Sequence, residues 1–224
     1  MMFGKGATIG KLSSAADLSP LAPASWSVRE VLGRLVEVSG NASVSASFGL
    51  IAEAHRQGHP CAWVCCREAL FFPPDVIESG VDLQALLVVR ARDGVEAGRA
   101  ADKILRSGAF GLVVLDLGGR STISMAAQAR MVKLTQKYQS ALVVITDKEP
   151  SQPSLSSLVS LRCMAERKWL GGDRFSCRVH SLKDKRRGPV WSDVEAMRGP
   201  AGAGDVQLQT SESQLSTSQR LIHV

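Results

Sequence analysis

The stretch GRLVEVSGNASVSASFGLIAEAHRQGHPCAWV, residues 33–64, decides the fold. Its first part, residues 34–39, is an apolar run of strand length, and a helical periodicity follows over residues 46–57. Gly58 ends that helix, and CAWVCC at 61–66 is a second apolar run. A strand, a helix and a strand in this order predict a right-handed crossover between two parallel strands.

Strands and helices continue to alternate as far as residue 146. The further segments are predicted at 86–90 (strand), 93–108 (helix), 111–117 (strand), 121–138 (helix) and 141–146 (strand). The chain is 45% hydrophobic but only 5% aromatic, a composition typical of buried parallel strands covered by helices. The expected fold is therefore α/β, with a mainly parallel twisted sheet flanked by helices.

The pattern changes after Asp147. The three β-like runs that follow have no helix between them and span 158–164, 175–182 and 190–197. We expect them to be C-terminal antiparallel strands that extend the sheet. Three regions are predicted along the chain: an N-terminal lead-in with a short strand (1–24), a core domain (25–200) and a flexible C-terminal tail (201–224).

Two helix starts carry local capping signals. Ser27 is followed three residues later by Glu30, and Asp93 is followed by Glu96. In such a capping box the first side chain accepts a hydrogen bond from the third N–H of the helix, and the acid returns one. We expect both boxes to form.

Composition excludes several classes of site. The five cysteines are odd in number and lack paired metal-ligand spacing, so we expect small buried apolar side chains and no metal site. No run approaches the ~20 apolar residues that span a bilayer, and the first residues lack the apolar run of a secretory signal. A cytoplasmic protein, associated with the nucleoid if it binds DNA, is the expectation.

The net charge of +6 is concentrated late in the chain. Between Arg162 and Arg198 there are ten lysines and arginines against five acids. Such a stripe attracts a phosphate backbone, but a solvated sheet face has the same composition, and both interpretations stay open. The candidate DNA-binding residues are Arg162, Arg167, Lys168, Lys185, Arg186 and Arg187.

Several segments, taken together and in order, resemble the bacterial recombinase RecA. Besides residues 33–64 they are FGKG (3–6), SGVDLQALLV (79–88), RSGAFGLVVLD (106–116) and VHSLKDKRRGPVW (179–191). The order and approximate spacing hold from Phe3 to about Pro200. The resemblance implies a RecA-like P-loop core.

The phosphate-binding loop departs from that family. A Walker A loop, Gly-x-x-x-x-Gly-Lys-Ser/Thr, wraps phosphates with backbone N–H groups, contacts them through its lysine and holds magnesium with its hydroxyl. The matching residues run from Gly40 to Ser47; Ser45 replaces the second glycine and Ala46 the lysine. We expect a degenerate nucleotide site, with Ser45 straining a turn that favours glycine.

The other catalytic positions implied by the resemblance are also changed. Arg67 stands where RecA has the acid that orients the attacking water, and Thr146-Asp147 stands where RecA has its glutamine sensor. Asp116 keeps the Walker B acid. We therefore expect no catalytic residues, no cofactor and no enzyme activity. Weak nucleotide binding through Ser47 and Asp116 stays open.

RecA binds DNA through two mobile loops, and the matching segments after Asp116 (117–124) and at 148–156 are short here. The combination of a degenerate P-loop and these shortened loops resembles the ImuA family of RecA-like proteins. The stretch SLVSLRCMAERKW…FSCRVHSLKDKRRGPVW (157–191) is most similar to it. This resemblance implies a non-hydrolysing accessory protein in SOS-induced, error-prone translesion synthesis. Its implied partners are an ImuB-type Y-family polymerase homologue and RecA, whose filaments it would inhibit or cap.

Lys183 and Lys185 match RecA lysines that reach a neighbouring subunit's nucleotide, and they are the candidate RecA interface. The strand-like piece 6–12 matches a second RecA subunit contact, although both features are also explained as inherited remnants. Two alternative functions stay open: a divergent ATPase and a single-stranded-DNA-binding module.

Overall fold

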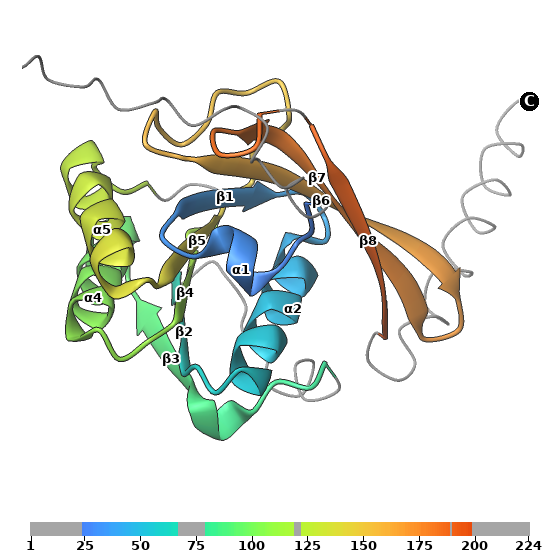
Figure 1. Cartoon of the computed structure of the whole chain (residues 1–224), viewed down its shortest axis with the longest axis horizontal. Helices are drawn as coiled ribbons and strands as arrows, with labels where there is room; N and C mark the ends of the chain where they lie inside the picture. Colours follow the sequence, from blue (N-terminus) through green and yellow to red (C-terminus); the bar gives the residue numbers. More distant parts are fainter. Residues whose placement is uncertain (1–23, 67–78, 119–121, 189, 199–224) are drawn as a thin grey trace, which may run out of the picture.

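The computed structural model describes residues 24–66, 79–118, 122–188 and 190–198. Eight strands form one sheet in the order β3-β2-β4-β5-β1-β6-β7-β8 (Figure 1). The parallel strands are β1 (Leu35–Ser39), β2 (Cys61–Cys66), β3 (Leu86–Ala91), β4 (Leu112–Asp116) and β5 (Ala141–Ile145). The remaining strands are β6 (Leu161–Gly171), β7 (Arg174–Asp184) and β8 (Ser192–Arg198). The expected α/β class is confirmed.

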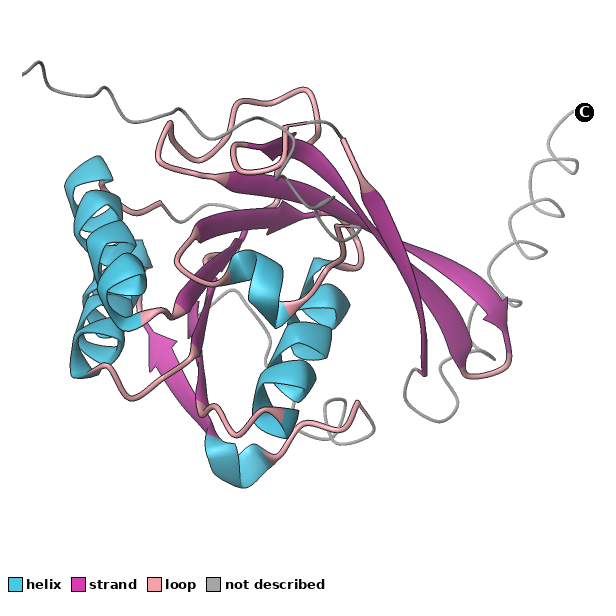
Figure 2. Cartoon of the chain, viewed as in Figure 1, coloured by secondary structure: helices cyan, strands magenta, loops and turns pink. Residues whose placement is uncertain are grey.

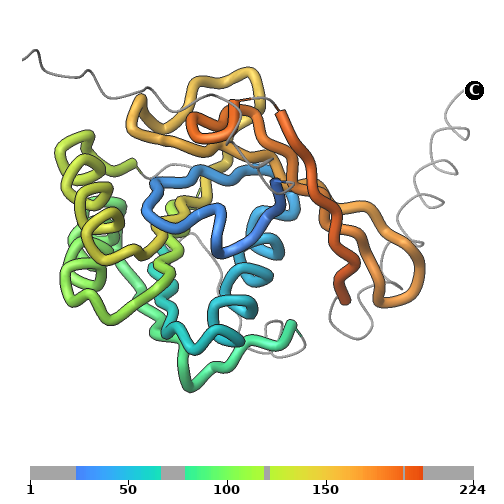
Figure 3. The backbone as a smooth tube through the Cα atoms, viewed as in Figure 1, coloured from blue at the N-terminus to red at the C-terminus, as the bar shows by residue number. Residues whose placement is uncertain are grey.

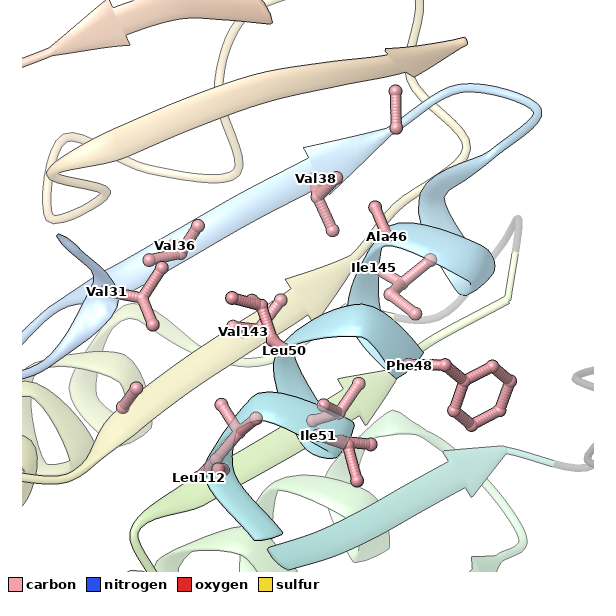
Figure 4. Packing of buried hydrophobic residues seen from close by; sticks show 14 of the residues in the cluster. Val31, Val36, Val38, Ala46, Phe48, Leu50, Ile51, Leu112, Val143 and Ile145 are labelled. Atoms are coloured by element: carbon pink, nitrogen blue, oxygen red, sulfur yellow. The ribbon is translucent and has the colours of Figure 1, made fainter. Parts of the chain in front are cut away.

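Helices cover both faces of the parallel strands (Figure 2). The helices are α1 (Val28–Val31), α2 (Ser43–Arg56), the 3-10 helix η2 (Leu83–Ala85), α4 (Gly94–Ser107) and α5 (Met125–Tyr138). One face packs against α1 and α2, where Leu50 and Ile51 contact the core that Val36 and Val143 help to form (Figure 4). The opposite face packs against α4 and α5. Because helices cover both faces of the sheet, successive residues of the central strands are all buried.

The three C-terminal strands form the antiparallel extension. Strand β6 pairs antiparallel with β7, and β7 with β8, while the other edge of β6 pairs parallel to β1. The β6–β7 hairpin extends away from α4 and α5 (Figure 3). The prediction of C-terminal antiparallel strands that extend the sheet is therefore confirmed, and β6 is the strand that joins them to the parallel part at β1.

Only one of the two capping boxes forms. Asp93 accepts a hydrogen bond from the Glu96 N–H at 2.8 Å, and Glu96 accepts one from the Arg92 N–H at 2.8 Å. Ser27 makes no side-chain cap to α1. The Glu30 carboxylate instead pairs with Arg187, and the Val28 N–H donates to Glu53 Oε2 at 2.9 Å. Contacts from distant segments replace the local cap at α1.

Other expectations have mixed outcomes. All five cysteines are buried as free thiols. Within the described segments, no helix is both long and apolar enough to cross a bilayer, and no cluster of His, Cys, Asp and Glu could hold a metal. The predicted lead-in (1–24, except Ala24) and tail (201–224) lie outside the described residues, as do Arg67 and the piece 6–12.

Candidate functional site: a closed phosphate loop

The segment predicted as a degenerate phosphate loop, here called the phosphate loop, joins β1 to α2 and lies against β6. Gly40 has a positive φ of 97°. A Cβ atom there would lie 2.3 Å from the Ala165 carbonyl oxygen and 2.5 Å from the Met164 sulfur. Only glycine fits so close an approach of two backbones, so Gly40 positions the loop against β6.

The loop is shorter than a Walker A loop because α2 begins at Ser43, three residues before the predicted start. Ser45 therefore lies in the first turn of a helix. Among the described non-glycine residues only Gln139 has a positive φ. The expected strain at Ser45 is wrong, since a helical residue needs no glycine.

The backbone donors that would wrap a phosphate are largely engaged. The Ala42 N–H donates to the Ala165 carbonyl at 3.1 Å, and the Ser43 N–H donates to the Gly40 carbonyl at 3.1 Å. The Ala46 N–H donates to the Ala42 carbonyl at 2.8 Å. A phosphate would have to displace β6 and the first turn of α2 to reach these groups.

Arg167 of β6 closes the loop from the solvent side. Its backbone N–H donates to Asn41 Oδ1 at 2.8 Å, and its guanidinium donates to Ser45 Oγ at 2.8 Å. The same guanidinium lies 4.4 Å from the centroid of the Phe175 ring. Arg167 was predicted as a DNA contact; the structure places it on the loop, where Asn41 and Ser45 hold it.

The two residues that follow Ser45 face the protein interior. Ala46 points toward β1 and β5 and is fully buried (Figure 4). Its carbonyl accepts a hydrogen bond from Trp26 Nε1 at 2.9 Å. Ser47 is also fully buried, and its hydroxyl donates to the Ser43 carbonyl at 2.8 Å. The position of the missing lysine therefore lies in the core, and the retained hydroxyl is engaged within α2.

Asp116 ends β4 and is buried. Burial raises its pKa; the hydrogen bond from the Gly118 N–H opposes this, and the nearby Asp147 carboxylate adds to the rise. Its Oδ1 accepts the Gly118 N–H at 3.2 Å. Among the described residues no cation pairs with it. Asp116 thus terminates a strand and caps the following turn.

The loop after β5 is held by a buried carboxylate. Glu37 of β1 is fully buried and accepts hydrogen bonds from Thr146 Oγ1 (3.1 Å) and the Leu155 N–H (2.9 Å). Lys148 Nζ and Arg162 Nε each lie 3.8 Å from this carboxylate. These contacts, which we call the Glu37 cluster (Glu37, Thr146, Lys148, Leu155 and Arg162), fix the loop to the sheet. The resemblance to RecA implies that this loop corresponds to its second DNA-binding loop.

Two arginines predicted to contact DNA make contacts inside the protein instead. Arg162 is buried beside Glu37, and its guanidinium donates to the carbonyls of Gln152 and Glu149. Arg187 pairs with the Glu30 carboxylate. Neither guanidinium is available to a phosphate, because each is engaged by a partner far away in the sequence.

Lys183 and Lys185 lie near the end of β7. Lys183 is half-buried, and both burial and the neighbouring Lys185 lower its pKa. Lys185 is exposed, and its Nζ donates to the Ser157 carbonyl. Arg186 is also exposed and donates to the Leu32 carbonyl at 3.1 Å. Of these three side chains, Lys185 contacts the loop after β5, and Arg186 contacts the segment after α1.

A cationic surface lies on the antiparallel strands, and Lys168 is its one member among the candidate DNA contacts predicted from the sequence. In β7, buried Phe175, Cys177 and Val179 alternate with residues that point to the other face. That second face, which we call the outer face, presents four exposed cations, Lys168, Arg174, Arg178 and Arg198. The alternation was visible in the sequence and would have identified the surface.

The outer face has the electrostatic character of a polyanion-binding surface. Arg174 lies directly opposite Arg198 in the strand register, and like charges in that arrangement are unfavourable. Among the described residues none of the four cations belongs to an ion pair, and Glu166 is the acid on this face of β6.

Comparison with known proteins supports a distant relationship to RecA. The chain is 32% identical to RecA of Rhodospirillum rubrum over 126 residues, which are 51% of this chain and 34% of that protein. RecA of Agrobacterium fabrum gives the same identity and coverage, and RecA of Haemophilus ducreyi is 34% identical over 88 residues, or 38% and 23% of the two chains. No family model matches. The chain is thus distantly homologous to RecA over about half its length, and the match spans about a third of the first two relatives.

Proposed function

We propose that the chain is a RecA-like accessory protein of DNA repair that acts through protein contacts and does not hydrolyse ATP. The closed phosphate loop carries this proposal. Arg167, Asn41 and Ser45 close its solvent side, and the Ala42 and Ser43 N–H groups are already bonded. An ATPase needs those groups free and needs a lysine at the position that Ala46 occupies.

The finer role follows from the resemblance to the ImuA family. A protein of that type serves SOS-induced translesion synthesis beside an ImuB-type polymerase homologue. The fixed loop after β5 supports a role outside strand exchange, since the Glu37 cluster restrains the segment that would have to move onto DNA.

Purified protein is expected to hydrolyse ATP no faster than a buffer control, with or without single-stranded DNA. Fluorescent ATP should show no saturable binding at concentrations up to the millimolar range, because the loop presents neither a lysine nor a free set of N–H groups. Phosphate release and fluorescence anisotropy measure the two quantities. Turnover that persists through purification and is abolished by Asp116→Ala would refute the proposal.

A second candidate function is single-stranded DNA binding, and the outer face favours it. Four exposed cations lie on adjacent strands with an unfavourable Arg174/Arg198 pair that a phosphate backbone would relieve. This surface lies within the stripe predicted between Arg162 and Arg198, of which Arg162 and Arg187 are instead engaged inside the protein.

Binding to single-stranded DNA is expected to be weak, independent of sequence and strongly dependent on salt. If four phosphates are neutralised, affinity should fall about fifty-fold between 50 and 200 mM salt. Arg174→Glu/Arg178→Glu should abolish binding in an anisotropy titration, and Lys185→Glu/Arg186→Glu is the matched control that should retain most of it. If Lys185→Glu/Arg186→Glu abolished binding and Arg174→Glu/Arg178→Glu did not, the binding site would lie at the end of β7.

A further inference from the structure

Strand β8 is the last strand of the sheet. It pairs with β7 on one side, and no described strand pairs with its other side. An exposed edge of this kind presents unpaired N–H and C=O groups to any extended chain that approaches it. Seven residues, Ser192–Arg198, make this edge long enough to hold a short peptide strand.

A shallow hollow lies beside this edge, on the face of β8 opposite to the outer face. Its lining consists of Trp26, Cys177, Val179, Asp193, Glu195 and Met197. The space enclosed in it is only about 10 Å³, about enough for one water molecule. The hollow is therefore a shallow depression of the surface that cannot enclose a nucleotide, and a side chain of a partner can lie across it but not enter it.

The chemistry of the hollow is apolar at its floor and acidic at its rim. Asp193 and Glu195 are two residues apart on one face of β8, so both carboxylates lie on the side of the hollow. Asp193 is held there by the Trp26 N–H, which donates to its Oδ2 at 2.8 Å. Burial raises the pKa of the Cys177 thiol to about 11, and Glu195 contributes to that rise.

No described cation pairs with either carboxylate. Arg167 is in the same cross-strand row as Glu195, but Cys177 of β7 lies between them. The Arg167 guanidinium is engaged by Ser45 and by the Phe175 ring. Two uncompensated acids therefore flank an apolar hollow on a chain whose net charge is +6.

We propose that the β8 edge and its hollow form a docking site for an extended basic segment of a partner protein. The segment adds to the sheet beside β8, and one of its lysine or arginine side chains lies across the hollow. The aliphatic stem of that side chain packs on the partly exposed Trp26 and Met197, while its charged head meets Asp193 and Glu195. The site is separate from the phosphate loop and the outer face.

A second copy of this chain fits the edge less well than a basic segment does. Antiparallel pairing of β8 with β8, centred on Glu195, places that carboxylate opposite its counterpart, and centring on Val194 places Asp193 opposite Glu195. Like charges directly opposite one another destabilise a strand pair. Charge complementarity thus selects a basic strand.

The test uses the full-length chain and a labelled nine-residue peptide of alternating valine and lysine, followed by anisotropy at low and high salt. Binding is expected. Glu195→Lys should weaken it about tenfold or more, because the ammonium group of the peptide lysine no longer meets the carboxylate of residue 195. The control Glu166→Lys makes the same charge change on the outer face and should leave binding unchanged. A peptide with glutamate in place of lysine should not bind.

Strand addition is tested separately from charge. The same peptide carrying N-methyl groups on alternate residues keeps its charge but cannot donate along the edge, and its binding should fall about tenfold or more. Equal binding of methylated and unmethylated peptides would overturn the proposal. So would equal effects of Glu195→Lys and Glu166→Lys. Hydrogen exchange of the free chain should show fast exchange for β8 amides that do not pair with β7; slow exchange there would mean that the chain fills its own edge.

Discussion

Replacing Arg34 by alanine is expected to lower the free energy of unfolding by about 3–5 kcal/mol, because it leaves a buried carboxylate without its partner. The Arg34 guanidinium donates to Asp184 Oδ1 at 2.6 Å, and the two side chains are 2% and 1% exposed. It also donates to the hydroxyl and carbonyl of Ser160 and to the Glu30 carbonyl. One side chain thus joins α1, the start of β1, the start of β6 and the end of β7.

Urea denaturation followed by tryptophan fluorescence measures this effect. The matched control is Arg106→Ala, which breaks a pair whose arginine is 62% exposed and should cost less than about 1 kcal/mol. Arg34→Met/Asp184→Leu should be more stable than Arg34→Ala, since it removes both charges together. Equal losses for Arg34→Ala and Arg106→Ala would show that the buried pair does not hold these elements.

The same pair predicts an acid-dependent loss of stability. Burial raises the pKa of Asp184, but hydrogen bonds from Arg34 and Trp191 outweigh it and hold the pKa at about 2, below the ordinary 3.8. The stabilisation from this carboxylate is therefore complete above pH 3.8 and is lost as the pH falls through about 2. Arg34→Ala should lack this decline.

Most elements could be predicted because their signals are local. The apolar run at 61–66 became β2 with identical bounds, and the strands predicted at 34–39 and 141–146 differ from β1 and β5 by one residue. The Asp93 box also formed, because both of its partners lie within one helical turn. Short-range patterns are reliable where no distant segment competes.

The phosphate loop could be predicted only in part. The resemblance to RecA puts Ala46 at the position of the Walker lysine. The start of α2, however, depends on β6, which packs on Gly40 and accepts the Ala42 N–H at Ala165. The role of Arg167 as a closure of that loop depends on the same contact. The sequence places these partners more than a hundred residues apart, so no local pattern could reveal them.

Among the charged residues, too, local patterns were informative and contacts between distant segments could not be foreseen. Charge density suggested Arg162 and Arg187 as DNA contacts, but Glu37 and Glu30 lie beside them in the fold. The period-two alternation around Arg178 was present in the sequence and predicts an exposed face without any tertiary information. Periodicity therefore carried more information about the cationic surface than the local excess of charge.

The resemblance to RecA motivates the functional prediction with the largest expected effect. That resemblance implies a subunit contact with nucleotide in the joint, and it matches Lys183 and Lys185 to lysines that reach a neighbour's nucleotide. Lys185 is exposed at the end of β7, so it is accessible to a neighbouring subunit. The phosphate loop of this chain is closed by Arg167, so the opposite side lacks a nucleotide to present to a further subunit. We expect a protein that adds to one end of a RecA filament and prevents extension there.

RecA filaments on single-stranded DNA should therefore shorten, and RecA ATPase activity should fall, at amounts of this protein well below one per RecA subunit. Electron microscopy of filament lengths and a phosphate-release assay measure the two effects. Lys183→Ala/Lys185→Ala and a variant lacking residues 1–12 should lose the activity, since each removes one of the RecA-like contacts. Arg174→Glu/Arg178→Glu should keep it, because it removes DNA binding by the outer face but leaves the end of β7 intact. If that last variant alone is inactive, the protein competes for DNA and does not cap RecA; if all variants act as the unaltered protein does, capping through these residues is excluded.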